Sequence, residues 1–457
     1  MVLPMSRATR PVSRLVPDIP LLRRGSRQVA PATTTSGSDD EVSVPAHFRC
    51  PISLDLMRDP VTAPTGITYD RESVEGWLAR GNATCPVTGR PVRLAELVPN
   101  HATRRMIQDW CVANRARGVE RVPTPRVPLG DADAADAVAA VSAASRRGDA
   151  VSCAAAAARA RALGKESERN WRSLASAGAV RALAKAFWRL AGERVEAGGA
   201  VAAALGEILA ALTVFFPLDD EARLRIASPA SLKSLVSVLA HGELAARAAA
   251  AIVLRELASS AGHATVEAVS RTPGLCDALV GLVKNPVSPA ATKAALVTAY
   301  YLVSASDRAA ARLAELGAVP VFVELLVDAD KGTSEKALAA LDGVLCAAAG
   351  RQAAAQHALA VPVLVKKMFR VSDMATEFAV SALWRLCQGA DGDAGAAACR
   401  AEALRVGAFQ KLLLLLQVGC AGVTKERASE LLKMLNGSRA SVECIETVDF
   451  KGLKRPF

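Results

Sequence analysis

The sequence predicts a mainly α-helical protein in which a small α+β domain precedes a long solenoid of helical repeats. Its 457 residues exceed what one hydrophobic core usually holds, and an apolar fraction of 51% is ample for several cores. Three prolines, Pro123, Pro125 and Pro128, divide the chain, because proline fixes φ and removes a backbone donor. Beyond them the sequence is rich in Ala and Leu and has helical periodicity.

Residues 1–44 form a basic N-terminal segment that we expect to be disordered. They are rich in Arg, Pro and Ser, and Asp18 is their only acidic residue before Asp39. A segment of this composition cannot bury enough apolar surface to fold. An Arg-rich start with few acids is also typical of an organellar transit peptide, which remains the alternative.

Two related tetrapeptides mark a domain predicted at residues 45–118. Cys50-Pro51-Ile52-Ser53 and Cys85-Pro86-Val87-Thr88 have the loop spacing of a zinc-binding cross-brace. Ser53 and Thr88 stand where each second Cys ligand would be, and a structural zinc site needs four Cys or His ligands. We therefore expect no metal site, and no motif in the chain calls for a cofactor.

The residues around these tetrapeptides resemble the U-box, a RING-like, zinc-free module of ubiquitin ligases. The resemblance rests on Phe48 to Met57, Asp59-Pro60-Val61, Gly66 to Arg71, Trp77-Leu78 and Pro99-Asn100-His101. The string is especially similar to the plant U-box proteins that carry armadillo repeats. It implies a RING-type protein ubiquitin transferase that has no catalytic nucleophile and forms no covalent intermediate with ubiquitin. Its chemistry would be positional.

The resemblance also implies where a ubiquitin-charged conjugating enzyme would dock. The docking residues would be Ile52, Leu54, Trp77 and Pro86. In many RING ligases an Arg after the second loop clamps ubiquitin; that position is Gly89 here, which makes Arg90 the candidate clamp. Asp70 is expected to cap the helix that carries Trp77.

A polar network is expected to replace zinc, because buried polar groups must find partners. Its candidate members are Ser53, Asp59, Thr68, Asp70, Arg71 and Thr88. Cys50 and Cys85 are expected to be small buried packing residues without reactivity.

A Pro-rich linker, residues 119–134, leads to a predicted armadillo-repeat solenoid at 135–440 and a tail at 441–457. The anchors Gly274, Gly317 and Ala360 are 43 residues apart, and each precedes an apolar helix. Gly407 follows after 47 residues; Gly178 lies 96 residues before Gly274, with an intervening unit near Ser231. This period is typical of armadillo or HEAT repeats, and about six units fit a right-handed solenoid. Glycine at each anchor would allow a tight bend.

These features predict a U-box ubiquitin ligase whose armadillo solenoid holds protein substrates for transfer of ubiquitin to lysine. Its partners would be a conjugating enzyme, ubiquitin, protein substrates and a second copy of the chain paired through the U-box. Lys366, Lys367 and Arg370 would give one long third helix a basic face in the substrate groove. By resemblance the protein would act in protein degradation during plant immunity and stress signalling. We expect it in the cytoplasm, with the nucleus as a further location.

The main alternative is a non-catalytic armadillo scaffold or adaptor with a ligase-weak U-box, which Gly89 favours. A nuclear-import adaptor would need repeated Trp-x-x-x-Asn, but Ala175, Gly192 and Gln388 follow the three tryptophans of the repeats. We expect those tryptophans, Trp171, Trp188 and Trp384, to be packing residues.

Other classes find little support. Aromatic residues make up 4% of the chain and no basic stripe interleaves with them, so nucleic-acid binding is not expected. No apolar run approaches the roughly 18 residues that span a bilayer. Ten singly spaced cysteines favour a reducing compartment.

The chain has an uneven distribution of lysine. Residues 1–164 contain none, and the first of fourteen is Lys165. Arginine cannot accept ubiquitin because its guanidinium stays protonated. Self-modification is therefore predicted at Lys165 and beyond, unless the amino terminus is used, with Lys331 and Lys336 favoured.

Overall fold

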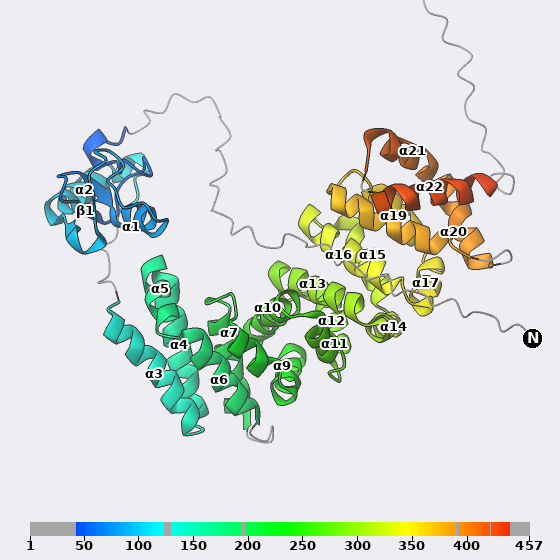
Figure 1. The fold of residues 1–457 in the computed structure, drawn as a ribbon, viewed down its shortest axis with the longest axis horizontal. Helices are drawn as coiled ribbons and strands as arrows, with labels where there is room; N and C mark the ends of the chain where they lie inside the picture. Colours follow the sequence, from blue (N-terminus) through cyan, green and yellow to red (C-terminus); the bar gives the residue numbers. More distant parts are fainter. Residues whose placement is uncertain (1–42, 123–128, 193–197, 390–392, 421, 439–457) are drawn as a thin grey trace, which may run out of the picture. The chain divides into compact units, whose positions relative to one another are not determined.

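The computed structural model describes residues 43–122, 129–192, 198–389, 393–420 and 422–438. They belong to two compact units, one ending at Leu129 and the other running from Gly130 (Figure 1). The basic segment predicted at 1–44 lies almost wholly outside the described residues, and the tail predicted at 441–457 lies entirely outside them.

The N-terminal unit, residues 43–122, surrounds a small antiparallel sheet. Its strands are β1 (Pro60–Thr62), β2 (Thr68–Asp70) and β3 (Val98–Pro99), in the order β2-β1-β3 with Val61 opposite Tyr69 and Pro99. The helices are α1 (Arg71–Ala79) and α2 (His101–Ala113), with 3-10 turns η1 (Ala46–Phe48), η2 (Leu94–Glu96) and η3 (Arg115–Arg117).

The core of this unit contains Met57, Val61, Tyr69, Val74 and Ile107, all essentially buried. Val119 and Val122 pack against the same core, so these two residues of the predicted linker belong to the folded unit. Helix α3 (Asp131–Arg146) likewise begins within the predicted linker. Both ends of that predicted linker therefore belong to folded units.

The second unit is a succession of helices, which confirms the predicted solenoid class (Figure 1). Helices α3 and α4 (Ala150–Glu166) form an initial pair, and α5 to α22 fall into six triplets within the described residues. The first three triplets are α5 (Glu168–Ser176), α6 (Ala179–Gly192), α7 (Gly198–Leu212); α8 (Asp220–Ile226), α9 (Pro229–His241), α10 (Leu244–Ser260); and α11 (His263–Ser270), α12 (Leu275–Lys284), α13 (Pro289–Ala305).

The remaining triplets are α14 (Asp307–Glu315), α15 (Ala318–Asp328), α16 (Lys331–Val344); α17 (Ala348–Ala355), α18 (Ala360–Lys367), α19 (Asp373–Cys387); and α20 (Ala394–Arg405), α21 (Ala408–Val418), α22 (Gly422–Gly437). The third helices pack in sequence, each against the next, from α4 and α7 through to α19 and α22. We call the second helices α6, α9, α12, α15, α18 and α21 the second-helix row.

Glycine anchors behave as predicted at four positions. Gly178, Gly274, Gly317 and Gly407 have φ of 87°, 76°, 76° and 80°, in the left-handed region that glycine enters without penalty. The other anchors differ. Leu359 precedes α18 with right-handed helical geometry, and α9 begins with Pro229 after the capping residue Ser228.

Two of the repeat tryptophans donate hydrogen bonds at the boundaries between repeats. The indole nitrogen of Trp171 donates to the Val214 carbonyl at 2.8 Å, and that of Trp384 donates to Glu430 at 2.7 Å. Trp188 is different, because 42% of it is exposed and the Arg225 guanidinium lies 5.6 Å from its ring centroid. Trp188 is therefore not a core residue, but its ring packs against Arg225 of α8. Among the described helices, none has the length and apolar character to cross a membrane.

Candidate functional site

The two Cys-Pro loops of the N-terminal unit have the same backbone hydrogen bonds. Cys50 donates to the Asp55 carbonyl and accepts from Leu54, at 2.9 and 2.8 Å. Cys85 donates to the Arg90 carbonyl and accepts from Gly89, both at 2.8 Å. The fourth residue after each cysteine therefore occupies an equivalent turn position, and both have positive φ, 62° at Leu54 and 69° at Gly89.

Strand β2 holds both loops through the two cysteine sulfurs. The amide of Asp70 donates to Cys50 Sγ at 3.3 Å, and the hydroxyl of the adjacent Tyr69 lies 2.8 Å from Cys85 Sγ. Thr65 Oγ1 and the Thr88 amide also donate to Cys85 Sγ, at 3.6 and 3.4 Å. The cysteines are buried as predicted, but they accept hydrogen bonds and so are more than packing residues.

The Cys85 thiol is electrostatically unlike the thiols of the solenoid. Burial would raise its pKa, but hydrogen bonds from Thr88, Tyr69 and Thr65 outweigh burial and lower the pKa to about 6. Burial raises the pKa of Cys153 and of Cys276 to about 11. A lowered pKa favours the thiolate, but Cys85 is only 2% exposed, so its lack of reactivity stays a prediction.

An ion cluster centred on Asp59 connects β1 to both helices of the unit. The Asp59 carboxylate accepts from Arg71 Nε at 2.7 Å and also from Arg104 of α2. Arg71 in turn lies 3.7 Å from Glu75, and these four side chains are between 10% and 18% exposed. The sequence indicated Asp59 and Arg71 but missed Arg104, which is 45 positions from Asp59.

Asp70 holds the first loop instead of capping α1 with its side chain. It occupies the N-cap position, yet its carboxylate accepts from the amides of Arg58 and Asp59 at 2.8 and 2.9 Å. The predicted side-chain cap is wrong because these two amides take the oxygen that would otherwise face the helix.

The other candidate network residues are less uniform. Thr68 bonds Thr62 at 3.0 Å, and Asn100 donates to both hydroxyls. Thr88 Oγ1 accepts from the Arg90 amide at 3.5 Å. Ser53 is exposed and accepts only a local bond from the Asp55 amide among the described contacts, so it lies outside the buried network. In the described parts of the chain, no three His, Cys, Asp or Glu side chains come together as a metal site.

The four predicted docking residues differ in exposure. Leu54 is 70% exposed and Pro86 is also exposed, whereas Ile52 is partly buried against the core. Trp77 is half-buried, and its indole nitrogen donates to the Thr84 carbonyl at 2.8 Å, which ties α1 to the second loop. Val87, which we did not select, is 55% exposed beside Pro86. Its position corresponds to Ile52 in the first tetrapeptide, and that correspondence could have indicated it.

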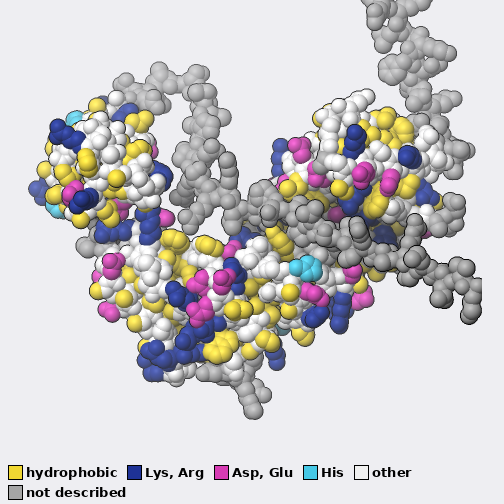
Figure 2. Space-filling model, in the orientation of Figure 1, with side chains coloured by type: hydrophobic (Ala, Val, Ile, Leu, Met, Phe, Trp, Pro, Cys, Tyr) yellow, Lys and Arg dark blue, Asp and Glu magenta, His cyan; other side chains and the backbone are white. Residues whose placement is uncertain are grey.

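Gly89 has a conformational reason to be glycine, because its φ of 69° lies in the left-handed region. The next residue, Arg90, is exposed, and its backbone amide and carbonyl close the second loop. Figure 2 shows apolar side chains beside basic ones on the visible face of the N-terminal unit.

Lys366, Lys367 and Arg370 do not lie on a third helix. The two lysines end the second helix α18, and Arg370 lies in the turn before α19. Lys367 is only 9% exposed, and its Nζ donates to Ser334 Oγ at 3.0 Å and to the Ala329 carbonyl at 3.5 Å. Burial and the neighbouring charge of Lys366 lower its pKa. Lys367 is therefore a buried link between repeats and not part of a basic face, whereas Lys366 and Arg370 are exposed.

Comparison with known proteins gives concordant results for both units. Residues 44–116 match the family model of the U-box domain, and residues 134–454 match that of the plant U-box protein ARM repeat region. U-box domain-containing protein 21 of Arabidopsis thaliana is 36% identical over 439 residues, covering 95% of this chain and 98% of that protein. E3 ubiquitin-protein ligase PUB23 of the same plant is 34% identical over 409 residues, covering 87% of this chain and 93% of that protein.

Among solved structures, a designed armadillo repeat protein in complex with the peptide (KR)4 has a TM-score of 0.43 and 19% identity. It covers 55% of this chain and 98% of its own. Because the two family models account for most of the sequence and full-length relatives share its order of domains, the chain belongs to the plant U-box family of ubiquitin ligases with an armadillo repeat region.

Proposed function

We propose that a ubiquitin-charged conjugating enzyme docks on the two Cys-Pro loops and on helix α1, which supports the second loop. The observation that carries this proposal is Leu54. It is 70% exposed and has a φ of 62°, although a leucine in the left-handed region is strained. Strain and exposure together at one loop residue are typical of a binding site.

The loops would act as a pre-organised surface. Asp70 and Tyr69 fix them to one strand through the sulfurs of Cys50 and Cys85, and Trp77 fixes the second loop to α1. Leu54, Pro86 and Val87 would then meet the conjugating enzyme without loop ordering, which lowers the entropic cost of association. Ile52 is partly buried against the core and would therefore contribute less contact area than the exposed Leu54.

The proposed chemistry requires no nucleophile on this chain. A substrate lysine amine attacks the thioester carbonyl of the charged conjugating enzyme; an amide bond forms, the C–S bond breaks, and the cysteine of the conjugating enzyme leaves as its thiol. The ligase holds the two reactants together. Arg90 is the proposed clamp for ubiquitin. Its carbonyl accepts the Cys85 amide and so closes the second loop, while its side chain is exposed. The solenoid would hold the substrate, and pairing of two U-boxes would place a second conjugating enzyme nearby.

A reconstituted reaction tests this proposal against the adaptor alternative, which the glycine at the clamp position favours. Full-length protein is mixed with activating enzyme, a panel of conjugating enzymes, ubiquitin and ATP. The proposal predicts ubiquitin chains that depend on the added protein and decrease in Arg90→Ala. Background chain formation with every conjugating enzyme, from protein verified as folded, would favour the adaptor.

A further inference from the structure

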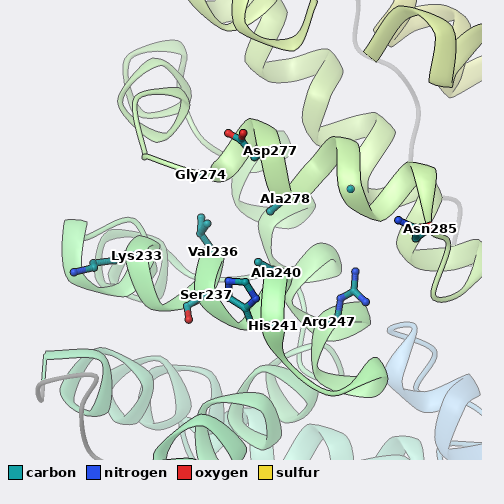
Figure 3. A pocket seen from close by; sticks show the side chains of 11 residues that line it. Lys233, Val236, Ser237, Ala240, His241, Arg247, Gly274, Asp277, Ala278 and Asn285 are labelled. Carbon is teal, nitrogen blue, oxygen red and sulfur yellow. The ribbon is translucent and has the colours of Figure 1, made fainter. Parts of the chain in front are cut away.

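A pocket of about 550 Å³ opens along the second-helix row, between α9 and α12 (Figure 3). Its floor is made of short side chains and glycine: Val236, Ala240, Gly274, Ala278 and Gly281. None of its lining residues belongs to the Cys-Pro loops, and Arg247 of α10 is the lining residue that comes from a third helix.

The repeat register explains why the pocket is at this place. The residue seven positions after the N-cap residue is Gly281 in α12, Glu324 in α15 and Lys366 in α18. Glu324 and Lys366 are long, exposed side chains, whereas Gly281 has no side chain. At Gly281 an added Cβ would meet no atom within 4 Å. The residue four positions after the N-cap residue is also smaller in α12, where it is Ala278, than in α15 and α18, where it is Val321 and Val363.

Cationic groups lie at the two ends of the pocket. Lys233 of α9 is at one end, and Arg247 lies with Asn285 at the other (Figure 3). Arg247 Nε donates to the Leu239 carbonyl at 3.0 Å, which anchors this side chain beside the pocket. The one lining carboxylate, Asp277, pairs with Arg312 at 3.2 Å, so its negative charge is offset. The pocket therefore attracts anions.

We propose that this pocket binds a short acidic peptide segment, with small side chains over Ala278 and Gly281 and carboxylates toward Lys233 and Arg247. From Lys233 to His241 the helix advances about 12 Å at 1.5 Å per residue, which is the length of about four extended residues. An extended strand with an acidic residue near each end matches both the length and the charge.

This site goes beyond ubiquitin transfer, because binding requires only the solenoid. It would give the protein a recognition element for acidic segments of substrates or regulators. The experiment therefore measures peptide binding directly and follows ubiquitin-chain synthesis separately. A failure of the peptide proposal can then be distinguished from a failure of the proposed ligase function.

The test uses full-length protein and fluorescein-labelled hexapeptides with Glu at the second and fifth positions and Ala or Ser elsewhere. Matched peptides carry Lys in place of Glu. Fluorescence anisotropy should show binding of the acidic peptides that weakens with salt, and at least about tenfold weaker binding of the Lys peptides.

Variants at one position then distinguish the pocket from general surface charge. Gly281→Glu introduces the residue that α15 has in this register, and it should lower affinity for the acidic peptide by about tenfold or more. Gly281→Ala is the matched control, and we expect it to stay within about twofold of the native protein. Lys233→Gln combined with Arg247→Gln should lower affinity by at least about fivefold.

Three results would overturn the proposal: equal binding of acidic and Lys peptides, native affinity in folded Gly281→Glu, or no binding of the acidic peptides at all. Synthesis of free ubiquitin chains should be the same in Gly281→Glu as in the native protein. That readout checks that the variant is folded and that its U-box is intact.

Discussion

Replacing Leu54 by glycine separates docking on the conjugating enzyme from folding of the U-box. Leucine in the left-handed region costs about 1–2 kcal/mol, while glycine loses about 0.5–1 kcal/mol more backbone entropy on folding. These two terms have opposite signs. We therefore expect the free energy of unfolding of Leu54→Gly to stay within about 1 kcal/mol of the native value.

Docking should respond differently. Full burial of a leucine side chain contributes about 1.5–3 kcal/mol, and 70% of Leu54 is available to a partner. Its loss should cost about 1–2 kcal/mol of binding, or about 5- to 30-fold in affinity. The assay is ubiquitin-chain synthesis at sub-saturating conjugating enzyme, with thermal unfolding measured in parallel.

Leu94 provides the matched control, since it is 52% exposed in the same unit but lies in η2, outside the two loops. Leu94→Ala should leave chain synthesis unchanged. Native activity of folded Leu54→Gly at limiting conjugating enzyme would refute the assignment of this loop to docking, and unfolding of the variant would refute the strain argument.

Four further predictions concern the interactions that hold the U-box and the sites it modifies. Arg104→Ala leaves Asp59 with one cation fewer and should lower the free energy of unfolding by about 2–3 kcal/mol. Arg105→Ala, at the exposed neighbouring position, should leave it unchanged; equal stability of the two variants in a denaturant titration would contradict this prediction. The pKa of Cys85 is lowered from 9.0 to about 6, so ionisation of this thiol stabilises the folded U-box. This contribution to the free energy of unfolding is complete above pH 9 and is lost as pH falls through 6. The free energy of unfolding of the U-box should thus rise by on the order of 3 kcal/mol between pH 6 and 8.5. If a Cys85→Ala variant kept this pH dependence, the Cys85 thiolate would be excluded as its cause. Strong chelators should leave melting temperature and activity unchanged, and elemental analysis should find no stoichiometric zinc. Mass spectrometry of the self-modified protein should find conjugates only at Lys165 and beyond, with exposed Lys331 favoured; prominent attachment to non-lysine residues of the U-box would be the contrary result.

The sequence was sufficient for the fold class because its signals are local. The Cys-Pro tetrapeptides and the 43-residue anchors are read along the chain, and four glycine anchors indeed have positive φ. Asp59 and Arg71 could be selected because the motif string contains both. Their partner Arg104 could not, since nothing in the spacing of α2 indicates which of its side chains faces β1.

Two other differences have identifiable causes. The burial of Lys367 depends on its register in α18, where its long stem follows the apolar face and its amine reaches Ala329 and Ser334. Its proximity to Lys366 in the sequence suggested an exposed basic face instead. The pKa of Cys85 depends on Tyr69 and Thr65, whose positions relative to the sulfur follow from the fold and not from sequence spacing.

The most direct test of the account is discharge of ubiquitin from a purified, ubiquitin-charged conjugating enzyme to free lysine in a single turnover. We predict that full-length protein accelerates this discharge, that Leu54→Gly requires a higher protein concentration for half-maximal acceleration, and that Arg90→Ala lowers the maximal rate. Discharge at the same rate with and without folded protein, for every conjugating enzyme in the panel, would contradict the proposal that this chain positions the thioester for transfer.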